Sequence, residues 1–174
     1  MTDRPRILVF TGDGKGKTTA AVGMAVRAAG HGLASCVLQF VKADASTGEV
    51  LAAAKLGVEI RQLGLGFVPE PTDARFAEHK SAAEAALEQA RGVIASGDYP
   101  LVVLDEVCFA VAKGLLGEQA VIDAVSAAPP SACVVLTGRG ATAGLIDLAD
   151  TVTEMRCVKH ALDAGRRAQK GVEM

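Results

Sequence analysis

Short apolar runs alternate with longer segments of helical periodicity along the whole chain. The apolar runs lack regular polar alternation, which predicts strands that are buried on both faces of a sheet. These predicted strands are residues 6–11, 35–40, 58–62, 101–105, 132–137 and 151–156. The helical patterns predict helices at residues 17–29, 48–56, 73–96, 108–115, 117–127 and 143–148.

The alternation of strands and helices predicts how the strands run. Right-handed crossovers through helices return successive strands in the same direction, so the sheet should be mostly parallel. We therefore expect an α/β fold of three layers, with a central sheet of about six strands and helices on both faces. The chain has 174 residues and no repeat or linker divides it, so residues 1–174 should form a single domain.

A glycine-rich turn joins the first predicted strand to the first predicted helix. Glycines let backbone N–H groups turn toward a polyphosphate, and the helix N-terminus and Lys17 add positive charge. The Thr18 hydroxyl is placed to ligate Mg²⁺. The predicted phosphate-binding residues are Gly12, Asp13, Gly14, Lys15, Gly16, Lys17, Thr18 and Thr19.

The spacing of this loop departs from the common pattern G-x-x-x-x-G-K-[ST], because only three residues lie between Gly12 and Gly16. A chance glycine-rich turn is the alternative interpretation. The strand before the loop and the helix after it favour a nucleotide site, and a site of this kind implies a P-loop NTPase fold.

Two carboxylates end the fourth predicted strand. In P-loop proteins a carboxylate at this place holds Mg²⁺ directly or through water. We expect Asp105 to be the indirect partner, and Glu106 to contact the metal or position a reacting group. Arg139 follows the fifth predicted strand, so it should face the same rim and neutralise phosphate charge, unless it is a solvated residue of a surface turn.

Composition narrows the classes of partner and compartment. The net charge of −2 and the aromatic content of 3%, without Trp, argue against a nucleic-acid partner. No apolar run approaches the roughly 20 residues that span a bilayer, and the N-terminus does not resemble a signal peptide. Four scattered cysteines without C-x-x-C spacing indicate buried free thiols in a cytoplasmic protein, with metal ligation as the minor alternative.

Two irregular stretches of the chain each allow two interpretations. Residues 62–72 contain two glycines, two prolines and Phe67, which indicates either a shaped ligand-binding loop or a plain connection whose Phe67 packs in the core. The basic tail, residues 157–174, is either a solvated end or a cap over an anionic site. The three histidines share no catalytic or metal-binding spacing, so none is assigned as a base.

Taken together, these segments resemble the P-loop ATP:corrinoid adenosyltransferases, also called cob(I)yrinic acid a,c-diamide adenosyltransferases, over nearly the whole chain. The resemblance rests on TGDGKGKTTAA at 11–21, RAAGHG at 27–32, QFVK at 39–42, TGE at 47–49, GF at 66–67, VVLDE at 102–106, TGRG at 137–140, DLADTVTEM at 147–155, VKHALDAG at 158–165 and AQKGVE at 168–173. The short P-loop with its internal Lys15 is typical of this family. The implied fold is the RecA-like form of the P-loop NTPases.

The resemblance implies transfer of the 5′-deoxyadenosyl group of ATP to the Co(I) centre of a corrinoid, with release of triphosphate. It implies Lys17, Glu106 and Phe67 as catalytic residues, and Mg²⁺ or Mn²⁺ held by Thr18 and Glu106 with Asp105. Phe67 corresponds to an aromatic residue that helps remove the lower axial ligand of the corrinoid. A second aromatic, often Trp, follows it by two residues in the family, where this chain has Pro69.

The family also implies a homodimer, a reducing partner such as a flavoprotein, and a role in adenosylcobalamin synthesis or salvage. Two other functions remain as alternatives. One is a P-loop ATPase or kinase that releases phosphate, and the other is a nucleotide- or corrinoid-binding module without turnover.

Overall fold

One sheet of six parallel strands forms the middle layer of the computed structural model, which describes residues 4–172. The strand order is β3-β2-β4-β5-β1-β6, and every neighbouring pair is parallel. The strands are β1 (Arg6–Thr11), β2 (Ser35–Gln39), β3 (Glu59–Gln62), β4 (Leu101–Asp105), β5 (Cys133–Thr137) and β6 (Thr151–Glu154). The ends of the predicted 1–174 domain, and of the tail that runs to 174, lie outside the described residues.

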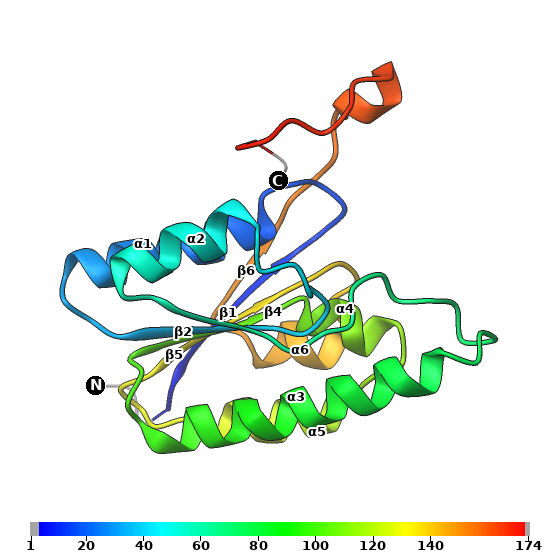
Figure 1. Cartoon of the computed structure of the whole chain (residues 1–174). Helices are drawn as coiled ribbons and strands as arrows, with labels where there is room; N and C mark the ends of the chain where they lie inside the picture. Colours follow the sequence, from blue (N-terminus) through cyan, green and yellow to red (C-terminus); the bar gives the residue numbers. More distant parts are fainter. Residues whose placement is uncertain (1–3, 173–174) are drawn as a thin grey trace.

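Helices cover both faces of this sheet (Figure 1). One face carries α1 (Lys17–Gly30) and α2 (Gly48–Leu56). The other carries α3 (Phe76–Ser96), α4 (Val107–Ala112), α5 (Glu118–Ser126) and α6 (Ala143–Leu148). The predicted three-layer α/β fold is confirmed. No helix of residues 4–172 is long and apolar enough to cross a membrane.

Two apolar cores explain why the strand sequences lack polar alternation. Val37, Val103 and Val135 belong to the core that includes the buried Ala21 and Ala25 of α1. The alternate positions of the same strands, Leu38, Leu104 and Leu136, belong to the second core with the apolar residues of α3 and α5. Each central strand therefore has apolar side chains on both of its faces.

The strand order brings distant segments to one edge of the sheet. β5 lies between β1 and β4, with Val135 opposite Leu8 on one side and Val103 on the other. This insertion of a strand between the loop-bearing strand and the carboxylate-bearing strand is the RecA-like arrangement. Because all strands are parallel, the segments that follow β1, β4 and β5 meet at the same edge.

The edge strand β6 is fixed at both ends to β1. The backbone N–H of Asp150 donates to the carbonyl of Ile7 at 2.8 Å, and the Asp150 carboxylate accepts the N–H of Ile7 at 2.8 Å. At the other end, the N–H of Met155 donates to the carbonyl of Thr11 at 2.8 Å. These bonds carry the chain closely past the loop that follows β1.

The structure differs from the sequence predictions mainly at element ends. α3 begins at Phe76 instead of residue 73, because the Asp73 carboxylate accepts the N–H of Arg75 at 2.9 Å and forms a turn before the helix. A short 3₁₀ helix, η1 (Ala161–Ala164), was not predicted. The four cysteines are free, as expected, and Cys36 and Cys108 are buried. Cys133 is half-buried and Cys157 is exposed, so the prediction of burial is wrong for Cys157.

Truncating Leu87 tests the larger core. Leu87→Ala should lower the free energy of unfolding by about 3 kcal/mol, because the side chain is 4% exposed and its removal leaves a cavity. Leu51→Ala is the matched control, since Leu51 also lies in a helix but is 58% exposed, and it should cost well under about 1 kcal/mol. Urea denaturation of both variants measures the difference, and equal losses would contradict this packing.

Candidate active site

The loop between β1 and α1 is shaped by the chain that passes behind it. A Cβ on Gly12 or Gly14 would lie only 2.5 or 2.7 Å from the carbonyl oxygen of Met155. Gly14 donates its N–H to that same oxygen at 2.6 Å. Gly12 and Gly16 also have positive φ angles of 92° and 109°, a region that favours glycine. Glycine is therefore required here by close backbone approach and by conformation.

Lys17 spans this loop from the first turn of α1. Its ammonium group donates to the carbonyl oxygens of Gly12 and Gly14, both at 2.7 Å, and the residue is 7% exposed. Burial lowers the pKa of Lys17, while the nearby carboxylate of Glu106 opposes that change. The loop thus holds a largely desolvated positive charge at the place where an anion would bind.

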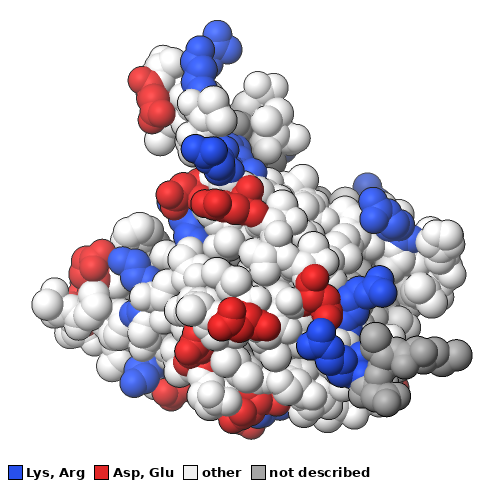
Figure 2. Space-filling model, turned by 180° about the vertical axis from the view of Figure 1, so that it is seen from behind, with Lys and Arg blue, Asp and Glu red and all other residues white. Residues whose placement is uncertain are grey.

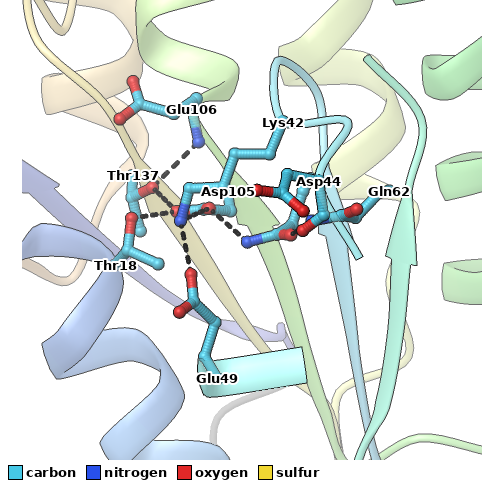
Figure 3. Close-up of polar contacts among 9 residues, drawn as sticks. Thr18, Lys42, Asp44, Glu49, Gln62, Asp105, Glu106 and Thr137 are labelled. Atoms are coloured by element: carbon cyan, nitrogen blue, oxygen red, sulfur yellow. Dashed lines mark hydrogen bonds and ion pairs between the residues drawn. The ribbon is translucent and has the colours of Figure 1, made fainter. Parts of the chain in front are cut away.

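Asp105, at the end of β4, is fully buried and surrounded by donors (Figure 3). Its Oδ1 accepts hydrogen bonds from the hydroxyls of Thr18, at 2.8 Å, and Thr137, at 2.7 Å. Its Oδ2 accepts from Nε2 of Gln39 at 3.0 Å, and the Lys42 ammonium lies 3.6 Å away. Four side chains from three segments of the chain therefore converge on one buried carboxylate.

Glu106 follows directly and has a strained backbone. Its φ of 64° makes it the one non-glycine residue with positive φ in the described part of the chain. Its N–H donates to the Thr137 hydroxyl at 2.9 Å, and it forms the N-cap of α4. Burial raises the pKa of the Glu106 carboxyl, and Asp105 raises it further. Strain of this kind persists where the surroundings fix it, and it is frequent at functional sites.

Lys42 and Glu49 complete the charged cluster, and neither was predicted as a site residue. Lys42 follows β2 and Glu49 begins α2, and their side chains form an ion pair of 2.9 Å. Burial acts to lower the pKa of Lys42, but Asp105 and Glu49 outweigh it, so the pKa is raised. The signal that could have found Lys42 is a lysine just beyond the carboxyl end of a buried strand.

These residues border a cavity of about 430 Å³, within the range of small-molecule sites. Three cationic groups of the P-loop and its rim, Lys15, Lys17 and Arg139, face it, as does the carboxylate of Glu106. The full lining is Gly14, Lys15, Gly16, Lys17, Thr18, Thr19, Val22, Lys42, Gly48, Glu49, Glu106, Arg139, Gly171 and Val172. The structure thus brings most of the predicted phosphate- and metal-binding residues together.

Gly12 and Asp13 occupy a different place from the other predicted loop residues. They border a second hollow, of about 440 Å³, with Gly140, Ile146 and Glu154 among its other lining residues. The Gly12 carbonyl nevertheless accepts the Lys17 ammonium, so Gly12 still shapes the main cavity. Asp13 is exposed on the outer side of the loop, and the structure does not bring its side chain into the main cavity.

The oxygen donors at the cavity fit a metal ion that arrives with a polyphosphate. Among residues 4–172, no three His, Cys, Asp or Glu side chains are grouped to hold a metal by themselves. Mg²⁺ commonly takes only one or two protein oxygens together with phosphate oxygens and water. Thr18 and Glu106 line the cavity and can supply those oxygens, while Asp105 lies behind Thr18 at hydrogen-bonding distance.

Phe67 lies outside this cavity, on the segment between β3 and α3. Its side chain is 93% exposed, so the interpretation that it packs in the core is wrong. The neighbouring Val68 and Pro69 are buried, and Gly66 donates its N–H to the carbonyl of Val41 at 2.7 Å. The segment is thus a shaped loop that presents a single aromatic ring to solvent.

The C-terminal tail leaves the body of the molecule after β6 as an extended arm (Figure 1). The arm is exposed along most of its length, and Figure 2 shows its Lys and Arg side chains on the projecting part. Gly171 and Val172 nevertheless line the main cavity. A solvated segment thus leads to two residues that border the cavity, and neither is basic, so the interpretation of the tail as a cap over an anionic site stays a prediction.

Comparisons with known proteins agree with this geometry. A family model described as ATP:corrinoid adenosyltransferase BtuR/CobO/CobP matches residues 3–174. A corrinoid adenosyltransferase of Pseudomonas aeruginosa is 46% identical over 173 residues, which cover 98% of this chain and 84% of that protein. The corrinoid adenosyltransferase CobA of Salmonella typhimurium is 44% identical, over 98% of this chain and 86% of that protein. A corrinoid adenosyltransferase of Escherichia coli K12 is 41% identical with the same coverage.

The strained backbone at Glu106 can be tested by two substitutions that both remove its carboxylate. Glu106→Gly should be more stable than Glu106→Ala by about 1 kcal/mol, because glycine adopts a positive φ without steric cost. In an unstrained exposed helix the order would reverse, since alanine is then favoured. Chemical denaturation of the two variants gives the comparison, and an alanine variant of equal or greater stability would show that the backbone is not strained.

Proposed function

Because the chain belongs to the ATP:corrinoid adenosyltransferase family, we propose that it transfers the 5′-deoxyadenosyl group of ATP to the Co(I) centre of a corrinoid and releases triphosphate. The observation that carries this proposal is the match over nearly the whole chain, together with a cavity in which Lys17 is held across a phosphate-binding loop. The acceptor is cob(I)yrinic acid a,c-diamide or cob(I)alamin, in the synthesis or salvage of adenosylcobalamin.

The chemistry needs positioning and charge stabilisation more than proton transfer. The electron pair of Co(I) forms the bond to the ribose C5′, and the pair of the broken C5′–O bond leaves with triphosphate. No protein nucleophile or general base takes part in that exchange. This agrees with a cavity whose lining holds lysine, arginine and glutamate side chains but no histidine or cysteine.

The residues around the loop would stabilise the negative charge that triphosphate gains as it leaves. Lys17 is already desolvated, so its attraction to a phosphate is not weakened by water. Lys15, Arg139 and the N–H groups of the loop add to it. Gly12, Asp13, Gly14, Gly16 and Thr19 belong to the same predicted nucleotide site.

Thr18 and Glu106 would hold Mg²⁺ or Mn²⁺ on the triphosphate, with Asp105 as the indirect partner. When bound, the metal would neutralise phosphate charge and orient the leaving group. Asp105 would keep the Thr18 hydroxyl oriented. Their hydrogen bond of 2.8 Å directs the hydroxyl hydrogen toward Asp105, which leaves the lone pairs of the Thr18 oxygen for the metal.

Phe67 would act on the second substrate. By resemblance, ATP lies in the loop in the reverse of the usual orientation, which turns C5′ toward the corrin. We propose that the exposed Phe67 ring helps remove the lower axial ligand, which makes the four-coordinate Co(II) easier to reduce. Its 93% exposure supports this role, because a ring that must meet a large planar corrin has to be accessible.

Further partners are implied by the family and by the chemistry. We propose that the protein works as a homodimer in the cytoplasm, with a reducing flavoprotein as the source of the Co(I) state. Sedimentation velocity of the purified chain tests the first part, and a single species with the mass of one chain would contradict it.

The reaction itself is tested by one anaerobic assay. The protein is mixed with ATP, Mg²⁺ and chemically reduced cob(I)alamin, and the visible spectrum and released phosphates are followed. A photolabile alkyl-cobalt product with one triphosphate per turnover would support the proposal, and cob(I)yrinic acid a,c-diamide can then be compared. No product from either corrinoid would indicate a binding module, and orthophosphate without corrinoid would indicate an ATPase.

Removing the Lys17 charge should abolish most of the turnover. Lys17→Ala should lower kcat by at least about a hundredfold, because the ammonium faces charge that develops in the transition state. Lys55→Ala is the control, since Lys55 is an exposed lysine of α2 outside the cavity lining. Turnover of Lys17→Ala near that of the control would contradict the assigned site.

Truncating Phe67 should affect the two halves of the reaction unequally. Phe67→Ala should reduce the flavoprotein-coupled reaction, which starts from Co(II), more than adenosylation of chemically generated Co(I). Leu33→Ala is the control. It removes a partly exposed apolar side chain that precedes the first residue of β2, and it should alter neither assay. Equal losses in both assays would argue against a role of Phe67 in the reduction step.

A further inference from the structure

Two side-chain amides connect the buried Asp105 to the loop that carries Phe67 (Figure 3). Gln39 donates from Nε2 to Oδ2 of Asp105 at 3.0 Å. Gln62 donates from Nε2 to Oε1 of Gln39 at 3.0 Å, and also to the carbonyl of Asp44 at 3.0 Å. Gln62 is the last residue of β3, so this chain of bonds ends where the 62–72 loop begins.

The direction of the Gln39 amide is fixed by its neighbours. Gln39 is fully buried, and an ionised carboxylate only accepts hydrogen bonds, so the NH₂ group must face Asp105. The amide oxygen then has to face Gln62. A buried amide that loses one partner is costly, so the Gln39 side chain should follow a displacement of the carboxylate.

The far end of the loop has a second tie to the same region. Glu70 accepts a hydrogen bond from the ammonium of Lys113 at 3.1 Å. Lys113 is the C-cap of α4, and the N-cap of that short helix is Glu106. Both ends of the 62–72 loop are thus connected to the segment that begins with Asp105 and Glu106.

Between these ties the loop follows the chain beyond β2. Leu63 donates its N–H to the carbonyl of Gln39 at 2.9 Å, and a Cβ on Gly64 would lie 2.2 Å from the backbone of Val41. The first half of the loop is thus held, and Val68 and Pro69 are buried, while the Phe67 side chain between these parts is 93% exposed and can meet a ligand.

We propose that Gln39 and Gln62 are positioning residues, through which occupation of the nucleotide site sets the 62–72 loop for the corrinoid. The identity of the second ligand as a corrinoid rests on the proposed function, whereas the coupling between the cavity and the loop does not. Neither glutamine lines the nucleotide cavity, so their influence has to pass through Asp105.

The nucleotide can act on this relay because Asp105 Oδ2 faces two groups at once. The Lys42 ammonium, which lines the cavity, lies 3.6 Å from the same oxygen that accepts Gln39. A triphosphate that attracts Lys42 changes the competition for that oxygen. Coupling between two ligand sites of this kind is typically about 5- to 150-fold in affinity.

Gln62→Met tests the relay without altering a group that faces the nucleotide. Gln119→Met is the matched control, because it makes the same chemical change at an exposed position of α5. Hydroxocobalamin is the corrinoid probe, since its Co(III) is not nucleophilic and ATP itself can be present without transfer. Calorimetry gives the Kd of hydroxocobalamin with and without saturating Mg·ATP, and hydrogen exchange of peptides over 62–70 reports the loop with Mg·ATP alone.

In the wild type and in Gln119→Met, we expect Mg·ATP to lower the hydroxocobalamin Kd at least about fivefold, which is the lower end of the usual range of coupling. We also expect Mg·ATP to slow hydrogen exchange of the peptides over 62–70. In Gln62→Met, the ratio of the two Kd values should fall to near one, and the exchange response should disappear. The Kd of Mg·ATP alone should stay within about twofold of the wild type, because Gln62 is not among the residues that line the cavity.

The outcomes separate the relay from the proposed function. An unchanged Kd ratio and exchange response in Gln62→Met, or no response to Mg·ATP in the wild type, would overturn the relay. If the wild type forms no cobalt–carbon bond with Co(I), the proposed function fails, while the exchange response to Mg·ATP still tests the relay.

Discussion

The site is organised around one buried negative charge. Asp105 has no exposed surface, and an ionised carboxylate in that position is tolerated only when donors surround it. Those donors come from three separate parts of the chain: Thr18 in α1, Thr137 in β5, and the end of β2, where Gln39 is followed closely by Lys42. Each is brought there by the parallel sheet, so the fold and the charge depend on each other. A displacement of any one of these segments would leave part of the carboxylate without a partner.

A second constraint acts on the backbone of the phosphate-binding loop. The chain that leaves β6 passes so close to the loop that Gly12 and Gly14 have no room for side chains. That passage is fixed by the bonds between Asp150 and Ile7 and between Met155 and Thr11. The loop is therefore shaped by an edge strand that the motif itself does not contain. The same chain continues into the arm that returns to the cavity at its end.

The sequence predicts those features that depend on local pattern. Apolar runs predicted the strands to within a few residues, and the glycine-rich turn predicted most of the loop residues that border the main cavity. The sequence does not predict contacts that form only when the sheet is folded. Gln39 looks like an isolated polar residue in an apolar run, and its purpose appears only when β2 lies beside β4. Lys42 and Glu49 belong to different elements, and the positive φ of Glu106 depends on Thr137 from another strand.

The nucleotide cavity and the Phe67 loop differ in physical character, and on the proposed function each would meet a different substrate. The nucleotide end is a recessed cavity with buried charges, which suits a triphosphate whose charge must be matched at fixed positions. The Phe67 end is an apolar ring in solvent, which suits a large planar ligand that binds through contact area. Pro69, where the family has a second aromatic, is buried and serves to shape the loop. On the proposed function, this chain would meet the corrinoid with one ring instead of two, which would make the position of that ring correspondingly more important. The exposed Glu70–Lys113 ion pair restrains the loop little, because water screens it. Phe67 instead follows Gly66, whose N–H donates to Val41, and precedes the buried Val68 and Pro69. The hydrogen bond from Gln62 to Gln39 adds a restraint at the start of the loop, because Gln39 in turn donates to the buried Asp105.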